Sequence, residues 1–167
     1  PHQQANPDAY VHVVERNAKG IVISGTKAIV TGGPYMHEFL VMPSRNMGRN
    51  DADFAVCCAV PVDAKGVTIV SRAAGRPGEK LEYGDALFSR KYGQSTAVVM
   101  FDKVFVPWER VFYESEWELS NVLTYSYATH HRHSCIAARA GFGDLLIGAG
   151  ALMCEANGLD PATKSNL

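Results

Sequence analysis

The sequence predicts an α+β chain, in which an antiparallel β-barrel or sandwich is followed by one long helix of a truncated helical bundle. Two observations lead to this prediction. As far as about Val111, short runs rich in Val, Ile, Phe and Thr alternate with Gly, Pro, Asn and Asp, which is typical of strands and turns. After Pro107 the pattern changes, and no proline interrupts the chain as far as Asn157. Short strands without helices between them favour antiparallel sheets.

The strand segments are expected at irregular intervals along the first half of the chain. Tight turns are expected at Asn17-Ala18-Lys19-Gly20 and at Asp63-Ala64-Lys65-Gly66, because both tetrapeptides combine a turn-forming side chain with glycine. The expected strands are residues 10–15, 20–24, 27–31, 38–42, 54–60, 67–71 and 97–104, with a short one near 85–90.

A single helix of about 35 residues is expected in the second half. Ser120 or Asn121 is a suitable N-cap, and Asn157-Gly158 is a suitable stop. Four glycines lie inside this helix, and each costs roughly 1 kcal/mol relative to alanine. A helix tolerates this cost mainly where another backbone comes close to the glycines. We therefore expect the helix to pack against partner helices that this chain lacks. The predicted domains are a middle β-domain at 1–112 and the start of a C-terminal helical domain at 113–167. The glycines are Gly141, Gly143, Gly148 and Gly150.

Composition and charge exclude some classes of function. The 167 residues are 47% hydrophobic and 20% charged, with a net charge of −1, as in an ordinary soluble domain with a core. Without a basic excess, nucleic acid is not an expected partner. The longest apolar runs, such as residues 145–152, are shorter than the roughly 20 residues that span a bilayer, so no membrane is expected either.

The four cysteines are Cys57, Cys58, Cys135 and Cys154. Neighbouring residues of a strand point to opposite faces, so Cys57 and Cys58 are poorly placed to pair with each other. The spacing suits no disulfide framework, and a cytoplasmic location is therefore expected. Buried structural thiols are the expectation for Cys57, Cys58 and Cys154.

Two segments resemble the acyl-CoA dehydrogenase superfamily. Residues 25–33, Gly-Thr-Lys-Ala-Ile-Val-Thr-Gly-Gly, are similar to a superfamily stretch whose threonine hydrogen-bonds the reactive edge of the flavin. Residues 91–93 and 99–107 look like the strand and exit turn that close its middle β-domain. The resemblance implies that Thr31 and Gly32 contact bound FAD.

A second set of segments, spread over nearly the whole chain, carries a closer resemblance. These segments are residues 1–4, 31–33, 37–38, 41–43, 101–110, 131–132 and 143–149. They are similar to the 4-hydroxyphenylacetate 3-hydroxylase and 4-hydroxybutyryl-CoA dehydratase family, and His37-Glu38 and His131-Arg132 are similar to the dehydratase side in particular. The resemblance implies FAD as cofactor, an acyl-CoA or a phenol as substrate, and a homotetramer in which neighbouring protomers share the flavin site.

In those dehydratases the histidine of the His-Arg pair is a ligand of a [4Fe-4S] cluster and the probable base. His131 matches that position, and a neutral imidazole suits either task. The dehydratases have a cluster cysteine seven residues later, but here that residue is Ala138, which argues against a [4Fe-4S] cluster of the usual kind. Cys135, four residues after His131 and on the same helix face, is an alternative metal ligand.

Several residues near these motifs have a structural interpretation. His130 and His133 cannot share one helix face with His131, and we expect them to be solvated or packed. Trp108 and Trp117 are expected to pack at the domain junction. Thr31 could be an ordinary strand-end hydroxyl, and His37-Glu38 a polar pair at a strand start.

Three functions remain open from the sequence. The first is a flavin enzyme that dehydrates an acyl-CoA or shifts its double bond; isomerisation has no leaving group and therefore needs no cluster. The second is an aromatic hydroxylase that uses reduced FAD and oxygen, which Ala138 favours and the two dehydratase-like pairs disfavour. The third is a catalytically silent fragment or binding module, because the missing domains would leave the flavin pocket open to water.

Overall fold

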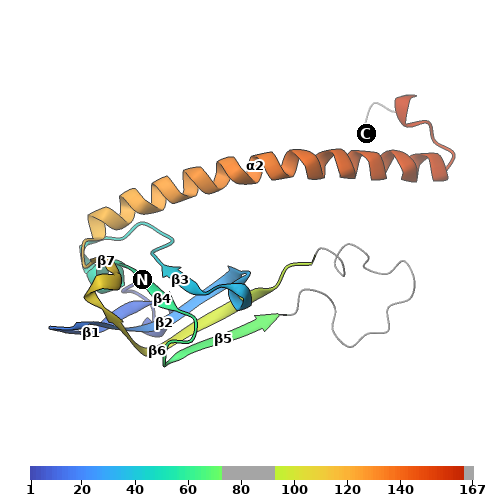
Figure 1. Cartoon of the computed structure of the whole chain (residues 1–167). Coiled ribbons are helices and arrows are strands. Elements are labelled where there is room, and N and C mark those ends of the chain that lie inside the picture. Colours follow the sequence, from blue (N-terminus) through green and yellow to red (C-terminus); the bar gives the residue numbers. More distant parts are fainter. Residues whose placement is uncertain (73–92, 164–167) are drawn as a thin grey trace. The chain divides into compact units, whose positions relative to one another are not determined.

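A computed structural model describes residues 1–72 and 93–163 of the chain (Figure 1). By compactness the chain divides into two units, Pro1–Thr124 and Tyr125–Leu167. The predicted strand near 85–90 lies outside the described residues. The expected boundary between residues 112 and 113 falls inside a strand, and it stays a prediction about domains.

The first unit contains two antiparallel sheets. The larger sheet has the order β1 (His12–Asn17), β2 (Gly20–Thr31), β6 (Thr96–Pro107) and β5 (Val67–Arg72). The smaller sheet has the order β3 (Glu38–Val41), β4 (Val56–Pro61) and β7 (Val111–Glu114). Short 3-10 turns connect them, namely η1 (Pro7–Ala9), η2 (Gly33–Tyr35), η3 (Arg49–Phe54) and η4 (Trp108–Arg110). Figure 1 shows β2 and β6 running side by side as the longest strands.

The apolar side chains of both sheets meet in one core, which confirms an antiparallel β-domain and makes it a sandwich. Burial alternates along β3 and along the first half of β6, as the period of two requires. Ile21, Ile23 and Val104 of the larger sheet are fully buried, as is Cys58 of the smaller one. The rest of this cluster is Val11, Val13, Phe39, Val41, Val56, Val60, Val99, Phe101 and Val106.

The two strands expected at 20–24 and 27–31 form one strand, β2. Gly25, which lies between the two expected strands, has a φ of 125° and pairs with Phe101 of β6. Two register shifts interrupt this ladder, one between Ile23 and Gly25 and one between Lys27 and Val30. The first gives β6 one extra residue and the second gives β2 one extra residue. The expected strand 97–104 is correspondingly longer, because it pairs with all of β2.

Two further differences concern the smaller sheet. The expected strand 54–60 begins at Val56, since Phe54 ends the turn η3. The strand β7 was not expected, because its four residues are too short to show a period; it pairs with β4 from Val56 to Cys58.

The helix α2 spans Trp117–Ala156, 40 residues, and begins before the expected caps. Asn121 does not cap it, because its side chain accepts from the Met47 amide (2.8 Å) and donates to the Met47 carbonyl (3.2 Å). The expected stop is confirmed: Gly158 has a φ of 72°, and the Leu159 amide donates to the Cys154 carbonyl at 2.9 Å. A last 3-10 turn, η5, covers Pro161–Thr163.

By length and composition alone, α2 could also cross a membrane. It contains an 18-residue window with a mean hydropathy of 1.4, none of it buried within the chain. The prediction from the sequence counted only uninterrupted apolar runs. Glycines and small polar residues interrupt those runs in α2 but lower the mean hydropathy of the window only a little. A core helix of a water-soluble protein meets the same criterion, so this finding is weak support for a membrane segment.

Candidate functional site

Thr31 and Gly32 lie where β2 ends and the turn η2 begins. Thr31 is exposed, and its hydroxyl makes no hydrogen bond with residues 1–72 or 93–163. Gly32 has a φ of 74°, and its amide donates to the Ser95 carbonyl at 2.8 Å. The left-handed conformation favours glycine and turns the chain directly after the threonine. A hydroxyl free to bond an external group therefore stands at a fixed strand end.

The backbone is strained two residues before Thr31. Ile29 lies in the bulge between Lys27 and Val30 with a φ of 60°, which is a genuine outlier for a β-branched side chain. Its side chain is 81% exposed, so burial does not offset the strain. Strain of this kind costs about 1–3 kcal/mol and tends to occur at functional sites. The bulge thus belongs to the candidate site with Thr31.

Lys27 also lies in this region. It belongs to the motif at residues 25–33, but the sequence did not indicate it as a site residue. Its ammonium donates to the Met42 carbonyl at 2.5 Å, and burial lowers its pKa. The thiols of Cys58 and Cys57 lie close enough to affect it electrostatically. In turn, burial raises the pKa of Cys58 to about 12, so this thiol stays protonated at neutral pH.

A cavity of about 180 Å³ adjoins Lys27. Its other walls are apolar except for Ser44, and they come from β2, β3 and β6. This arrangement, an apolar hollow with few polar groups, is typical of small-molecule sites. The apolar lining residues are Ala28, Val30, Phe39, Leu40, Val41, Val99 and Phe101.

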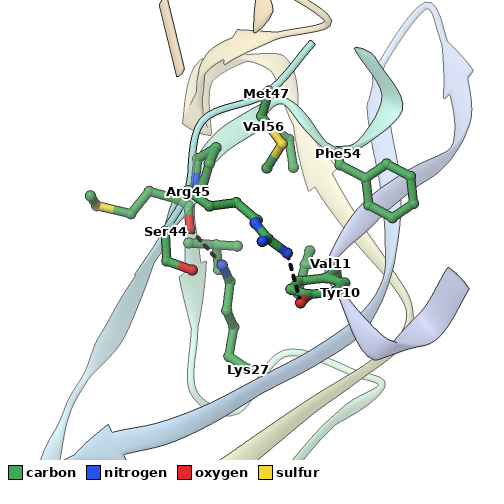
Figure 2. Close-up of a pocket in the computed structure, with 11 residues that line it drawn as sticks. Tyr10, Val11, Lys27, Ser44, Arg45, Met47, Phe54 and Val56 are labelled. Atoms are coloured by element: carbon green, nitrogen blue, oxygen red, sulfur yellow. Dashed lines mark hydrogen bonds between the residues drawn. The ribbon is translucent and has the colours of Figure 1, made fainter. Parts of the chain in front are cut away.

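Figure 2 shows a second, smaller hollow that is also lined by Lys27. At about 10 Å³ it has room for about one water molecule. Arg45 crosses its opening: its guanidinium donates to the Tyr10 hydroxyl at 3.0 Å and stands 5.6 Å from the centre of the Tyr10 ring. Lys27 and Arg45 therefore bring two cationic groups to the same hollow.

Two other charged groups of this unit have structural partners. Asp51 is buried and accepts from the His2 amide (2.9 Å), the His2 ring Nδ1 (2.6 Å) and the Gly48 amide (3.0 Å). Although burial opposes it, these hydrogen bonds hold the pKa of Asp51 below its usual range. Glu38 forms an ion pair with Arg110 at 2.8 Å, which fits the structural interpretation of His37-Glu38.

In the second unit, His131 and Cys135 face each other one turn apart on α2. The Cys135 sulfur lies 3.5 Å from Nε2 and 3.8 Å from Nδ1 of the His131 ring. The Tyr127 ring stacks on the same imidazole from the preceding turn, with centroids 5.8 Å apart. His130 and His133 are exposed and point elsewhere on the helix, in line with the expectation of solvated histidines.

The structure thus groups the predicted site residues in two pairs. Thr31 and Gly32 lie in the first unit, and His131 and Cys135 lie in the second. Ala138 supplies no ligand, and no group of three His, Cys, Asp or Glu suitable for a metal occurs within the described ranges. The alanine at position 138 therefore argues against a [4Fe-4S] cluster of the usual kind, because it removes one of the ligands that the family resemblance implies for this segment.

The remaining expectations are partly confirmed. Cys57 and Cys58 are buried free thiols, whereas Cys154 is only partly buried, because it lies on a helix with little cover. Trp117 packs against a small cluster formed by Met47, Phe54 and Ala55. Trp108 remains 41% exposed and donates its ring N–H to the Asn17 carbonyl.

The sandwich followed by a long helix, with a free threonine at a strand end, defines the middle part of an acyl-CoA dehydrogenase-like chain. A family described as 4-hydroxyphenylacetate 3-hydroxylase matches with its N-terminal part over residues 1–113 and with its C-terminal part over residues 120–165. The chain belongs to this family.

Two kinds of enzyme are similar to the chain in sequence. The 4-hydroxybutyryl-CoA dehydratase/vinylacetyl-CoA Δ-isomerase of Clostridium aminobutyricum is 35% identical over 98% of the chain and 34% of its own length. The 4-hydroxyphenylacetate 3-monooxygenase oxygenase component of Thermus thermophilus is 32% identical over 96% of the chain and 33% of its own length. The chain therefore spans about a third of the relatives it matches.

Solved structures of both kinds also match. An oxygen-tolerant archaeal 4-hydroxybutyryl-CoA dehydratase from N. maritimus superposes with a TM-score of 0.82 at 34% identity, over 98% of the chain and 33% of that structure. The oxygenase component of 4-hydroxyphenylacetate 3-monooxygenase, in complex with FAD and 4-hydroxyphenylacetate, gives a TM-score of 0.74 at 32% identity, over 93% and 32%. These matches confirm the expected fold.

Proposed function

We propose that this chain is the central part of an FAD-dependent enzyme that acts on an acyl-CoA, by shifting a double bond or by dehydration. The observation that supports it most directly is the 35% identity with the dehydratase/isomerase across both units, including the stretches that hold Thr31 and His131. The solved relative with bound FAD supports the choice of cofactor.

The end of β2 suits a flavin. Bound FAD would supply an electron-accepting ring and a polarisable edge for the reaction. Thr31 would donate its free hydroxyl to that edge, and the left-handed turn at Gly32 would bring backbone rather than a side chain against the ring. The strained bulge at Ile29 would keep the hydroxyl in place during turnover.

His131 would transfer the proton. In a double-bond shift a proton leaves the carbon next to the thioester carbonyl and another returns two carbons further along. A neutral imidazole can accept and return a proton near neutral pH. The stacked Tyr127 ring would hold the imidazole in one orientation, which is what a base needs in order to reach a defined carbon.

Among the two acyl-CoA reactions, we favour the double-bond shift. Dehydration needs a Lewis acid or a proton on the departing hydroxyl, and Ala138 stands where the family resemblance implies a cysteine ligand of the cluster. The shift has no leaving group, so the substitution of alanine at position 138 does not affect it.

A second candidate is hydroxylation of a phenol with reduced FAD and oxygen. Ala138 favours it, because that reaction needs no metal cluster, and 30% identity over 95% of the chain to the oxygenase component from Geobacillus sp. supports it. A homotetrameric assembly and a cytoplasmic location, both expected from the sequence, remain part of the proposal.

The two candidates are separated by substrate on the complete enzyme. Vinylacetyl-CoA should be converted to its conjugated isomer without oxygen uptake, and His131→Gln should lower the rate by about a hundredfold or more. The matched control is His130→Gln, one residue away on another face, which should leave the rate within about twofold. Oxygen uptake with 4-hydroxyphenylacetate and reduced FAD, without isomerisation, would overturn the proposal.

Flavin binding is tested separately. Thr31→Val in the complete enzyme should weaken FAD binding or shift its reduction potential, whereas Thr26→Val, on the same strand, should not. The 167-residue chain alone should bind FAD weakly or not at all, because much of the pocket would be open to water. A tight stoichiometric complex with the isolated chain would contradict this part.

A further inference from the structure

Ser95 is a buried serine that lies directly before β6 and next to the end of β2. Only 3% of its surface is exposed. Its hydroxyl donates to the Arg72 carbonyl at 2.6 Å, and its own carbonyl accepts from the Gly32 amide at 2.8 Å. A buried hydroxyl without a partner costs free energy, so the bond to Arg72 favours this one position of Ser95.

The two bonds of Ser95 join three strands at one level of the larger sheet. The strand β6 lies between β2 and β5 (Figure 1), and Thr96 is opposite both Thr31 of β2 and Arg72 of β5. Ser95 is the next residue outward, beyond the first residue of β6. Its side chain and its carbonyl therefore continue the bonding between strands where the regular ladder ends.

The turn at Gly32 is held through both of its backbone polar groups. Its amide donates to the Ser95 carbonyl, and its carbonyl accepts from the Tyr35 amide at 2.9 Å. The first bond ties the turn to the sheet, whereas the second lies within the turn η2. Because Thr31 directly precedes Gly32, the position of the Thr31 hydroxyl follows the position of this turn.

We propose that Ser95 is a positioning residue for the flavin contact of Thr31. This role rests on the proposed function, in which the Thr31 hydroxyl donates to the edge of bound FAD. Ser95 acts through the backbone: its bond to Arg72 fixes its carbonyl, and that carbonyl fixes the Gly32 amide. A binding group has to be held within about 0.5 Å of its productive position, so a looser turn weakens the flavin contact although Thr31 itself is unchanged.

A double-mutant cycle in the complete enzyme tests this role. Ser95→Ala removes one hydrogen bond and should change the same flavin property as Thr31→Val, by raising the FAD dissociation constant about fivefold or by shifting the reduction potential in the same direction. When Thr31→Val is already present, Ser95→Ala should raise that constant by less than about twofold and leave the potential where it is. A residue that only stabilised the fold would have the same effect in both backgrounds.

Ser24→Ala is the matched control. Ser24 is also a buried serine of the larger sheet, and its hydroxyl accepts from the Lys103 amide at 3.1 Å, away from the end of β2. This variant loses a comparable bond and should keep the FAD dissociation constant within about twofold. If Ser95→Ala does not fold, Ser95→Cys takes its place in the cycle, because a thiol is similar in size and a weaker donor.

The outcomes separate this role from the proposed function. If Thr31→Val changes the flavin but Ser95→Ala does not, or if Ser95→Ala has the same effect in both backgrounds, the role of Ser95 is overturned and the proposed flavin contact stands. If Thr31→Val itself leaves both flavin properties unchanged, the flavin contact is contradicted, and the role of Ser95 with it.

Discussion

The β-sandwich and the helix α2 use glycine in opposite ways. In the sandwich, a Cβ added to Gly25 would lie 2.2 Å from the Tyr10 carbonyl oxygen, so another backbone already occupies the space of a side chain. In α2, a Cβ added to Gly148 would meet no atom of residues 1–72 or 93–163 within 4 Å, and the same is true of its other interior glycines. Gly20 and Gly66 of the sandwich, like Gly25, are explained by backbone that lies against them. The glycines inside the helix have no such contact with the described residues.

Burial of the apolar side chains follows the same division. Ile23 of the sandwich has no exposed surface, whereas Leu146 of α2 is 71% exposed. An apolar side chain that stays in water contributes little to stability, because the hydrophobic effect requires its burial. The first unit therefore buries its apolar side chains within itself, whereas α2 carries apolar side chains that the described residues leave exposed.

The largest expected effect is that of Gly25→Ala. The new methyl group would clash with a carbonyl oxygen, and the residue would have to keep a φ of 125°, which alanine disfavours. We expect a loss of more than about 4 kcal/mol in the free energy of unfolding, measured by urea with tryptophan fluorescence. Gly48→Ala, where the new atom would only touch Asp51 at 3.8 Å, should change it by about 0.5 kcal/mol or less.

A smaller effect is expected for truncation of apolar side chains. Ile23→Ala leaves a cavity in the core and should cost about 2–4 kcal/mol in the same measurement. Leu146→Ala removes a side chain that is mostly in water and should change the unfolding free energy by less than about 0.5 kcal/mol. An equal loss of unfolding free energy in the two variants would contradict the different burial of Ile23 and Leu146.

The sandwich should also lose stability at alkaline pH through Cys58. Burial raises its pKa to about 12 in the folded chain, from an ordinary value of 9.0 for a cysteine thiol. The unfolded thiol loses its proton first, so the stability is fully present below pH 9 and falls as the pH rises towards 12. Between pH 8 and pH 10 this amounts to about 1.4 kcal/mol.

Comparison with Cys58→Ala isolates that contribution, because the lowered pKa of Lys27 acts in the opposite direction over the alkaline range. The unfolding free energies of the two proteins are measured at both pH values. If the difference in unfolding free energy between the unaltered chain and Cys58→Ala were the same at pH 8 and pH 10, the alkaline loss of stability would not come from Cys58.

The smallest effect is expected in α2. Gly148→Ala should raise the helix content of the chain, because alanine is favoured over glycine by about 1 kcal/mol and no neighbouring atom opposes the methyl group. Far-ultraviolet circular dichroism during thermal melting measures it. Gly158→Ala should have the opposite sign, since that glycine ends the helix at a φ of 72°. A loss of helix in Gly148→Ala would mean that this position already has a neighbour.

Much of the sandwich could be predicted because alternation marks its strands. Ile21 and Ile23 follow the period of two, and the hairpin at Asn17 and Gly20 is a typical turn sequence. The bulge at Ile29 could not be predicted, because a β-branched residue disfavours the left-handed conformation that it adopts. Asn121 was a plausible cap by residue type alone, and its bonds to the Met47 backbone depend on a loop far away in the sequence.

The candidate site was predictable where spacing or a motif defines it. The separation of four residues between His131 and Cys135 places them on one helix face, and Thr31 follows from its motif. Lys27 stood in the same motif, but its burial depends on the packing of β2 against β3, which no local pattern reveals. The contact between Arg45 and Tyr10 likewise joins segments that are 35 residues apart.

The two bulges shift the register of β2 against β6 by one residue and then shift it back. Between them, every residue of β2 faces a partner displaced by one position, and beyond the second bulge the original alignment returns, with Thr31 opposite Thr96. Deletion of Ile29 alone would put the end of β2 out of phase and turn Thr31 to the opposite face of the sheet. Deletion of both Ile29 and Lys103, the left-handed residues of the two bulges, would restore the alignment of that end. During divergence of this family, an insertion in one strand can therefore be retained if the other strand gains a residue too.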